Sequence, residues 1–187
     1  MYYKLVEVFF VANHKRKTVG FSFRIDEEWL DTLRAEAERQ GISVNALANR
    51  ILQNYDEHFR WTERLNAVFI TRPTLAEIIS CCPEEKIIEI AKTSGSIGAK
   101  DLIGTMGIAP TFNSIINFIE RMGKHGNWFD YSQYIVEKKM VLHLRHELGR
   151  KWSVFIANQV ATLFKELLNK TTKIEVHDNF ATIEVTT

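Results

Sequence analysis

The sequence contains few residues of the kinds that cross-link small folds or bind structural metals. Its two cysteines, Cys81 and Cys82, are neighbours in the chain. Adjacent cysteines rarely bridge each other, so no disulfide framework is expected, and a reducing cytoplasm is the compartment that fits. The chain also lacks a run of about 18 apolar residues, which a membrane-spanning helix would need. The first residues, MYYKLVEVFFVANHKRK, have no basic leader or small-residue cleavage site, so we interpret them as structure and not as a signal peptide.

An excess of charge of one sign is also missing. The 187 residues include 24 Lys and Arg against 23 Asp and Glu, a net charge of +1. The whole molecule is therefore not a polycation, and any case for nucleic-acid binding depends on where its charges lie. With 45% hydrophobic and 25% charged residues, the composition is that of a soluble globular protein. The length suffices for one ordinary domain or two small ones.

One segment near the N-terminus has the pattern of a lone strand. Between Thr18 and Asp26, apolar and polar residues alternate with the period of two that is typical of a half-buried strand. One face would carry Phe21, Phe23 and Ile25, and the other Gly20, Ser22 and Arg24. A strand needs a partner for its backbone donors and acceptors, and none is obvious in the sequence that follows.

Two short helices are predicted directly after this strand. Asp26 is suited to cap the first helix, because its carboxylate can accept a hydrogen bond from the first turn. Gly41 can adopt the left-handed conformation that ends such a helix, and Ser43 is suited to cap the second. Because one strand and two short helices cannot enclose a core, we expect a two-fold dimer whose strands pair antiparallel above four helices.

This stretch resembles the ribbon-helix-helix DNA-binding domain of the Arc, methionine-repressor and CopG type, over about residues 15–57. The match is one of pattern: an alternating strand ending in Arg-Ile-Asp, an acidic first turn, Gly-Ile-Ser between the helices and an aliphatic second helix. The resemblance implies that the outer strand residues Gly20, Ser22 and Arg24 read base edges in the major groove. Because glycine has no side chain, this readout would be sparse, and flanking contacts or DNA shape would have to add specificity.

Phosphate contacts are expected from two places. The basic run just before the strand is predicted to neutralise phosphates and release counterions. The resemblance adds the start of the second helix, where free backbone amides also favour an anion on physical grounds. The six expected phosphate-contacting residues are Lys15, Arg16, Lys17, Ser43, Val44 and Asn45.

A different pairing for the strand is left open by the sequence. Residues 2–12 also alternate, and residues 13–17 could form the turn of an ordinary hairpin within one sheet. The basic run would then be a solvated turn. In this alternative, the chain would be a ligand-binding or protein-binding domain with no role on DNA.

The rest of the chain is predicted to form a mixed helix and strand domain. Short helices are expected at residues 74–80, from Pro83 onward and at 111–122, with a loop and a short helix in the glycine-dotted segment TSGSIGAKDLIGTMG. Strands follow in YIVEKKMVLHLRH, either as one strand or as a hairpin at residues 137–139. Its alternation would place on one face Tyr134, Val136, Met140, Leu142 and Leu144. A long amphipathic helix and a hairpin with its bend at 177–179 would end the chain.

The expected fold class is therefore α+β, with a dimeric ribbon-helix-helix part followed by short helices, antiparallel strands and one long covering helix. We assign residues 1–14 to an N-terminal arm or strand, 15–60 to the ribbon-helix-helix domain and 61–73 to a linker. Residues 74–187 would form a regulatory, ligand-sensing or oligomerisation domain, and no family resemblance was identified for this part.

Catalytic and metal-binding interpretations have little support in the sequence. In a strand, His143 and His146 would point to opposite faces, and neither a CxxC nor an HxxxH spacing occurs. Glu147, His177 and the two cysteines complete the set of candidate chemical groups. Ordinary structural roles explain these residues better, so we predict no catalytic residue, no metal and no cofactor.

The sequence thus predicts a cytoplasmic, homodimeric, sequence-specific DNA-binding transcriptional regulator, for example a repressor. Its partners would be double-stranded DNA and a second copy of the chain, with tetramers and a small-molecule effector left open and no membrane contact. An alternative is an antitoxin-type protein with a toxin-binding C-terminal part, although such tails are usually short and fold on binding.

Overall fold

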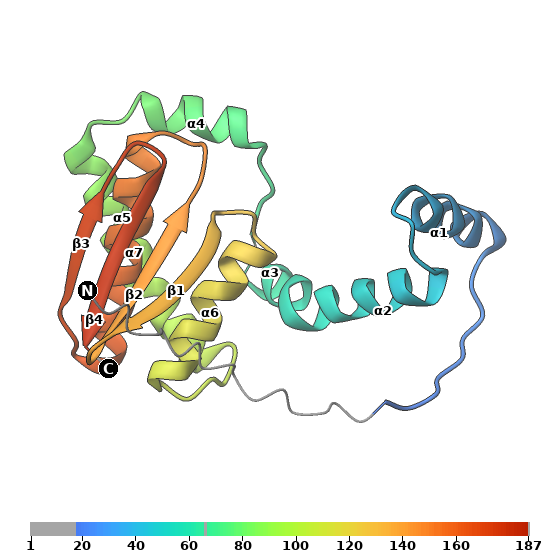
Figure 1. The fold of residues 1–187 in the computed structure, drawn as a ribbon. Helices are drawn as coiled ribbons and strands as arrows, with labels where there is room; N and C mark the ends of the chain where they lie inside the picture. The colour runs from blue at the N-terminus through green and yellow to red at the C-terminus, as the bar shows by residue number, and fades with distance from the viewer. Residues whose placement is uncertain (1–17, 66, 187) are drawn as a thin grey trace, which may run out of the picture. The chain divides into compact units, whose positions relative to one another are not determined.

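The computed structural model describes residues 18–65 and 67–186 (Figure 1). The chain divides into two compact units, one ending at Gln53 and the other beginning at Asn54, and each is described here by itself. The expected strand at residues 2–12 and the basic run at 15–17 lie outside the described residues.

The first unit contains the two predicted helices. They are α1 (Glu27–Arg39) and α2 (Val44–Asn54). Asp26 caps α1, because its carboxylate accepts a hydrogen bond from the Glu28 amide at 3.0 Å. Gly41 turns the chain with φ of +65°, a left-handed conformation that favours glycine. The Ser43 hydroxyl accepts a hydrogen bond from the Ala46 amide at 3.1 Å and caps α2. The predicted helices and their caps are confirmed.

The segment before α1 forms no strand in a single copy of the chain. Residues 18–26 have no helix and no ladder pairing in the part of the chain that the structure describes. A strand forms only when its backbone pairs with another strand, so the predicted ribbon requires a second copy. The ribbon therefore stays a prediction, and the described strands of the second unit provide no partner for this segment.

The second unit combines helices with one four-stranded antiparallel sheet, in agreement with a mixed helix and strand fold. A π-helical turn η1 (Tyr55–Phe59) leads into α3 (Arg60–Arg64), followed by α4 (Arg72–Ser80), α5 (Glu84–Gly104) and α6 (Phe112–Lys124). The strands are β1 (Asp130–Val136), β2 (Lys139–Arg145), β3 (Thr172–Val176) and β4 (Phe180–Thr186), with α7 (Arg150–Leu168) between β2 and β3. No described helix combines the length and apolar character needed to cross a membrane.

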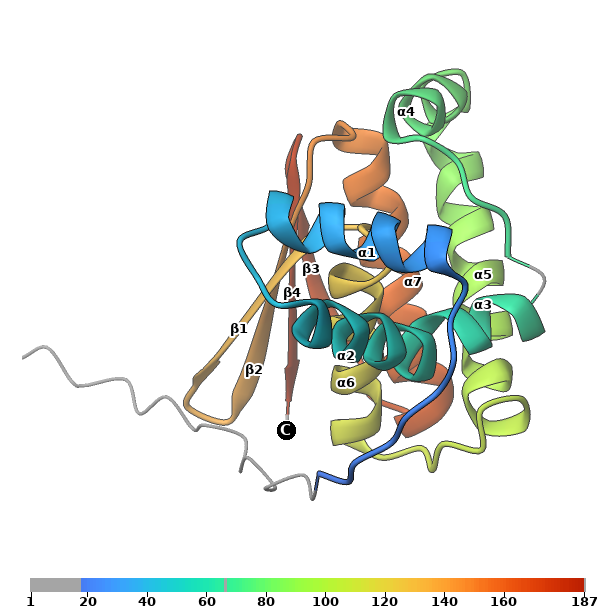
Figure 2. The ribbon, with the colours of Figure 1, turned by 90° about the vertical axis from the view of Figure 1, so that its right-hand side faces the viewer.

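The core of this unit lies between the sheet and α7. The strand order is β1-β2-β4-β3, and Figure 2 shows the sheet with α7 beside it and α5 on the other side of α7. In β2, Leu142 and Leu144 are fully buried and stand in register with Ile183 and Ala181 of β4. Phe164 of α7 is also fully buried, so the long helix covers the sheet as predicted.

The glycine-dotted segment departs from its prediction as a loop and short helix. It is helical from its start through Gly104, because α5 continues over 21 residues. A Cβ at Gly95 would lie 2.7 Å from the Thr162 Cβ and 2.8 Å from the Gln159 carbonyl oxygen on α7. The glycine therefore serves close helix packing and does not break the helix, a distinction that only the tertiary contact makes.

The strand prediction for residues 134–144 is corrected in one respect. The hairpin alternative is the observed one, with a turn at Glu137 and Lys138. Tyr134 pairs with Val141 and Val136 pairs with Lys139, so neither Tyr134 nor Val136 lies on the face of Met140 and Leu142. Side chains in register across a ladder share a face. Because two turn residues separate β1 from β2, even-numbered residues of β1 pair with odd-numbered residues of β2, and the alternation expected for one continuous strand does not hold.

Candidate nucleic-acid interface

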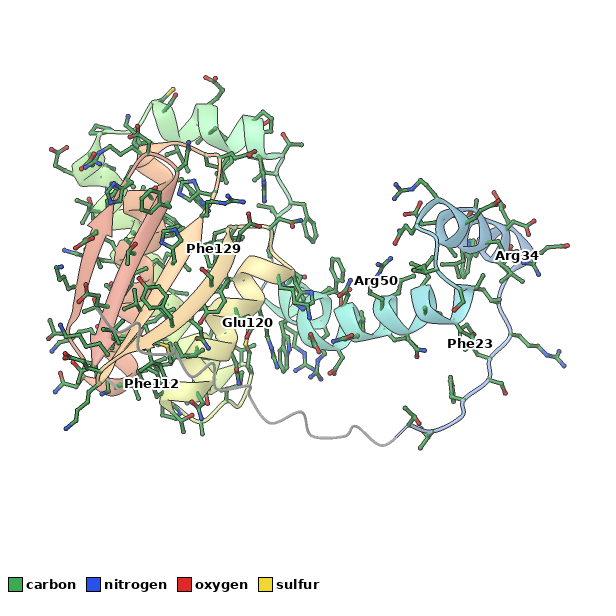
Figure 3. All side chains as sticks on the ribbon, in the orientation of Figure 1. Phe23, Arg34, Arg50, Phe112, Glu120 and Phe129 are labelled. Carbon is green, nitrogen blue, oxygen red and sulfur yellow. The ribbon has the colours of Figure 1, made fainter. Side chains whose placement is uncertain are left out.

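The three residues expected to contact bases are all accessible. Gly20, Ser22 and Arg24 lie exposed in the segment before α1. A Cβ at Gly20 would meet no atom within 4 Å, so the single chain has no steric need for glycine there. Figure 3 shows that the side chains of this segment stand clear of α1 and α2, with Phe23 labelled among them. Lys15, Arg16 and Lys17, expected at phosphates, lie outside the described residues.

The alternate positions of the same segment carry exposed apolar side chains. Phe21 is 83% exposed and Phe23 is 59% exposed, and their ring centroids lie 6.1 Å apart. On α2, Ile51 and Leu52 are also exposed. Large apolar side chains that cluster on the surface of so small a unit usually mark an interface.

Very little of the first unit is buried. Among residues 18–53, all of which the structure describes, only Ala37 and Leu47 are buried. Two side chains do not make a hydrophobic core, and the unit is below the size at which one chain encloses its own core. The described residues of the first unit therefore do not enclose a core of their own.

The start of α2 carries the residues predicted to contact a phosphate, and that contact stays a prediction. The Ser43 hydroxyl already accepts the Ala46 amide, so the amides nearest to an incoming phosphate are those of Val44 and Asn45. Asn45 is exposed, and Val44 is half-buried. The partial positive charge of a helix N-terminus favours a phosphate at this position.

A polar network links α1 to α2 within the unit. Arg39 and Gln40 donate hydrogen bonds to the Glu36 carboxylate, and these bonds lower the pKa of Glu36 to about 2. The Gln40 amide oxygen in turn accepts a hydrogen bond from Arg50 of α2. The network holds the end of α1 against α2 and thereby the start of α2 in place.

The residues considered for catalysis are not brought together. His146 is buried, and its Nδ1 accepts a hydrogen bond from the Leu148 amide at 3.1 Å. The Nε2 atom of the neutral ring therefore carries the proton, and it donates a hydrogen bond to Ser153 Oγ at 2.8 Å. Burial, with a smaller contribution from Arg72, lowers the pKa of His146 to about 4. This neutral, buried pair joins the residue after β2 to the first turn of α7.

Two of the other candidate groups, His143 and His177, pack against the same Phe180 ring, and the His143 centroid lies 4.8 Å from it. His143 Nδ1 lies 3.2 Å from Thr182 Oγ1, and the His177 ring stacks on Phe180 with centroids 4.2 Å apart. Cys81 is exposed at the end of α4, and the Cys82 thiol contacts the Ile78 carbonyl oxygen at 3.7 Å. No group of three His, Cys, Asp or Glu residues that could hold a metal ion occurs among the described residues.

A titratable cluster that the sequence did not reveal connects η1 to the end of α6. Glu57 Oε2 lies 3.0 Å from His125 Nε2, and the His58 ring stacks on that of His125 with centroids 5.8 Å apart. Burial, and then His125, lower the pKa of His58. The paired residues are 68 positions apart in the chain, so no local pattern could have predicted the contact.

A groove of about 450 Å³ runs beside the contact between α5 and α7. Its lining is mixed: the charged residues are Lys92 from α5, Lys165 and Glu166 from α7 and Lys170 after it, and uncharged residues such as Ser96 and Ala161 make up the rest. The volume is within the range of small-molecule sites. The sequence did not reveal this groove either, because its walls come from separate elements.

No family model matches the chain, and no curated protein matches its sequence. Its function is therefore inferred from the residues and from their arrangement.

Proposed function

We propose that the protein is a sequence-specific DNA-binding transcriptional regulator that acts as a homodimer. Residues 18–25 of two copies pair as an antiparallel two-stranded ribbon, and the ribbon enters the major groove. A two-stranded ribbon has the dimensions to enter that groove, where each base pair presents a distinct set of donors and acceptors.

The main support for this proposal is that the first unit buries few of its described side chains and leaves its alternating segment without a partner strand in the part of the chain that the structure describes. This unit has two well-capped helices, but only two of its residues between 18 and 53 are buried, and its alternating segment exposes Phe21 and Phe23. Pairing with a second copy would satisfy the backbone of this segment and cover the two rings with the helices of the dimer.

The alternation of polar and apolar residues in this segment then predicts which residues contact DNA. If Phe21, Phe23 and Ile25 face the helices, period-two geometry turns Ser22 and Arg24 to the outer face of the ribbon. Arginine is suited to guanine, whose O6 and N7 it can contact with two donors. The amides at Val44 and Asn45 would hold a backbone phosphate and set the depth of the ribbon in the groove.

A gel-shift experiment tests the proposal with the full chain and a pool of random duplexes from which bound DNA is recovered. The expected result is an enriched motif with two half-sites related by two-fold symmetry, and binding that weakens steeply with salt because phosphate contacts release counterions. Binding with no enriched motif would contradict sequence-specific regulation, and absence of any binding would favour a domain that acts without DNA.

Copurification, and not the gel shift, separates a regulator from an antitoxin. An antitoxin-type protein would bind DNA as well, but a small partner protein would copurify with it and contact its C-terminal part. The second unit of this chain has its own buried core, whereas toxin-binding tails usually fold on binding. This observation favours a regulator, in which the second unit binds an effector or a further copy. A small effector would be sought in the groove beside α5 and α7.

A further inference from the structure

The edge strand β1 extends beyond the helices that cover the rest of the sheet. Ile135 of β1 stands in register with Met140, and Gln133 with Leu142. Met140 and Leu142 are buried, yet Ile135 is 48% exposed and Gln133 is exposed as well. Among the described residues, the helical layer therefore ends above β2 and does not cover the second half of β1.

The outer side of β1 has little of the protection that edge strands usually carry. Tyr134, Ile135 and Val136 are consecutive apolar residues, each about half exposed, and so both faces are apolar at this end of the strand. The one charged residue of β1 is Asp130, at its opposite end. Natural edge strands are commonly shortened or charged to prevent pairing with other chains, and β1 is neither.

The other edge of the sheet provides an internal comparison. β3 has five residues against seven in β1, and it packs against α7. Its outward positions carry Lys173 and Glu175, which form ion pairs with each other and, through Lys173, with Glu184 of β4. One edge of the same sheet is thus short, covered and charged, while the other is long, apolar and open.

We propose that β1 pairs antiparallel with β1 of a second copy and continues the sheet across a two-fold axis at Ile135. In this register, Ile135 faces its own copy on the covered side, and Tyr134 faces Val136 of the second copy on the other side. All three half-exposed apolar side chains then gain an apolar cross-strand neighbour, whereas a register centred on Gln133 would oppose Asp130 to Val136. Antiparallel self-pairing is two-fold by construction, so a second copy satisfies it without further elements.

This proposal rests on the proposed function only in that the ribbon also requires a second copy. The two contacts use different elements and can fail separately. If both join the same two chains, the protein is a dimer held at two places; if they join different pairs, it is a tetramer.

Disulfide trapping tests the register in the full-length protein. In a background with Cys81→Ser and Cys82→Ser, Ile135→Cys places one thiol per chain at the proposed axis. Directly opposed Cβ atoms on neighbouring strands lie about 4.5–5.5 Å apart, close enough for a disulfide after a small adjustment. Under mild oxidation at micromolar concentration, we expect most of the chain to run as a cross-linked dimer on a non-reducing gel.

The matched control is Lys173→Cys in the same background, which places an exposed thiol on the opposite edge and should remain uncross-linked. Equal cross-linking of the two variants, or none at position 135, would overturn the proposal. Ile135→Lys gives a second measurement, because a buried pair of like charges at the axis should raise the dissociation constant of this contact at least tenfold in sedimentation. An unchanged constant would also overturn it.

Gel shifts with the same variants distinguish the two proposals. Cross-linking at position 135 without any DNA binding by the wild-type protein would support the edge contact and reject the ribbon regulator. DNA binding with an enriched two-fold motif, together with no cross-linking, would reject the edge contact alone.

Discussion

Single side chains in this protein have separable roles, and Arg24 is the clearest case. It is exposed in the segment before α1, on the polar side of the alternation. Replacing Arg24 by Ala should cost about 1–3 kcal/mol, or about 5- to 150-fold in affinity, on the selected operator. The loss on random DNA should be far smaller, because a base contact discriminates sequences and a phosphate contact does not. Titration of both duplexes in gel shifts measures the difference.

Arg34→Ala is the matched control for this measurement. Arg34 is exposed on α1 and pairs with Asp31 at 3.0 Å, so its removal changes the net charge equally without touching the ribbon. Equal losses on operator and random DNA for Arg24→Ala would show that Arg24 does not read bases.

His146 is a residue whose protonation state should set part of the pH dependence of folding. Its pKa is about 4 in the folded protein and about 6.5 when exposed, so the unfolded chain binds more protons between these values. Stability should be at its full value above about pH 6.5 and fall as the pH approaches 4, by up to about 3 kcal/mol. Denaturant midpoints at pH 7 and pH 4.5 measure the loss.

His146→Gln serves as the control, because glutamine can still donate to Ser153 but does not titrate in this range. This variant should be less stable at pH 7 than the wild type and show a flatter pH profile between 6.5 and 4. The same slope in both proteins would assign the acid sensitivity to other groups.

At the scale of elements, the contact between α5 and α7 determines how the glycines of α5 respond to substitution. Gly95→Ala would place a Cβ against Thr162 Cβ at 2.7 Å and the Gln159 carbonyl oxygen at 2.8 Å, so the helices would have to separate. We expect a loss of about 1–3 kcal/mol, as for other overpacked sites. Thermal or denaturant unfolding gives the value.

Gly98 is the matched control on the same helix. A Cβ there would meet only Leu163 Cδ2, at 3.7 Å, an ordinary van der Waals contact. Because alanine favours a helix over glycine by about 1 kcal/mol, Gly98→Ala should be neutral or stabilising. Destabilisation of similar size in both variants would contradict close packing at Gly95 as the cause.

The helices and strands also show which structural features a local sequence pattern can predict. Asp26 and Ser43 predicted the caps of α1 and α2, and both form the expected hydrogen bonds, because capping involves residues only two or three positions apart. The glycines misled the prediction of α5, because Gly95 serves close packing against Thr162, which lies more than 60 residues away in the chain. The face of Tyr134 was wrong because a two-residue turn shifted the alternation.

For the whole molecule, the two units should differ in how their stability depends on concentration. The second unit has a core of its own between α7 and the sheet, while the first unit buries only Ala37 and Leu47 among its described residues. If the first unit folds by dimerisation, amide protection in α1 and α2 should fall on dilution, because mass action separates the copies. Protection in β2 and β4 should not change.

Hydrogen exchange followed by mass spectrometry across a hundredfold dilution measures both units in one sample. Protection of α1 and α2 that is independent of concentration would show that the first unit is stable without a second copy. Such a result would remove the main support for the ribbon.

The sequence by itself determined the features that depend on near neighbours. These are the caps, the turn at Gly41, the amphipathic α7, the two C-terminal strands and the mixed helix and strand class. Their signals are spacing and residue type within a few positions, which is the range over which backbone hydrogen bonding acts. Only the tertiary structure decided which glycines permit close helix packing, that His125 meets Glu57, that His146 is enclosed and that β1 is left open. Each of these depends on atoms brought together by the packing of distant segments, and side-chain burial is a property of that packing and not of the local chain.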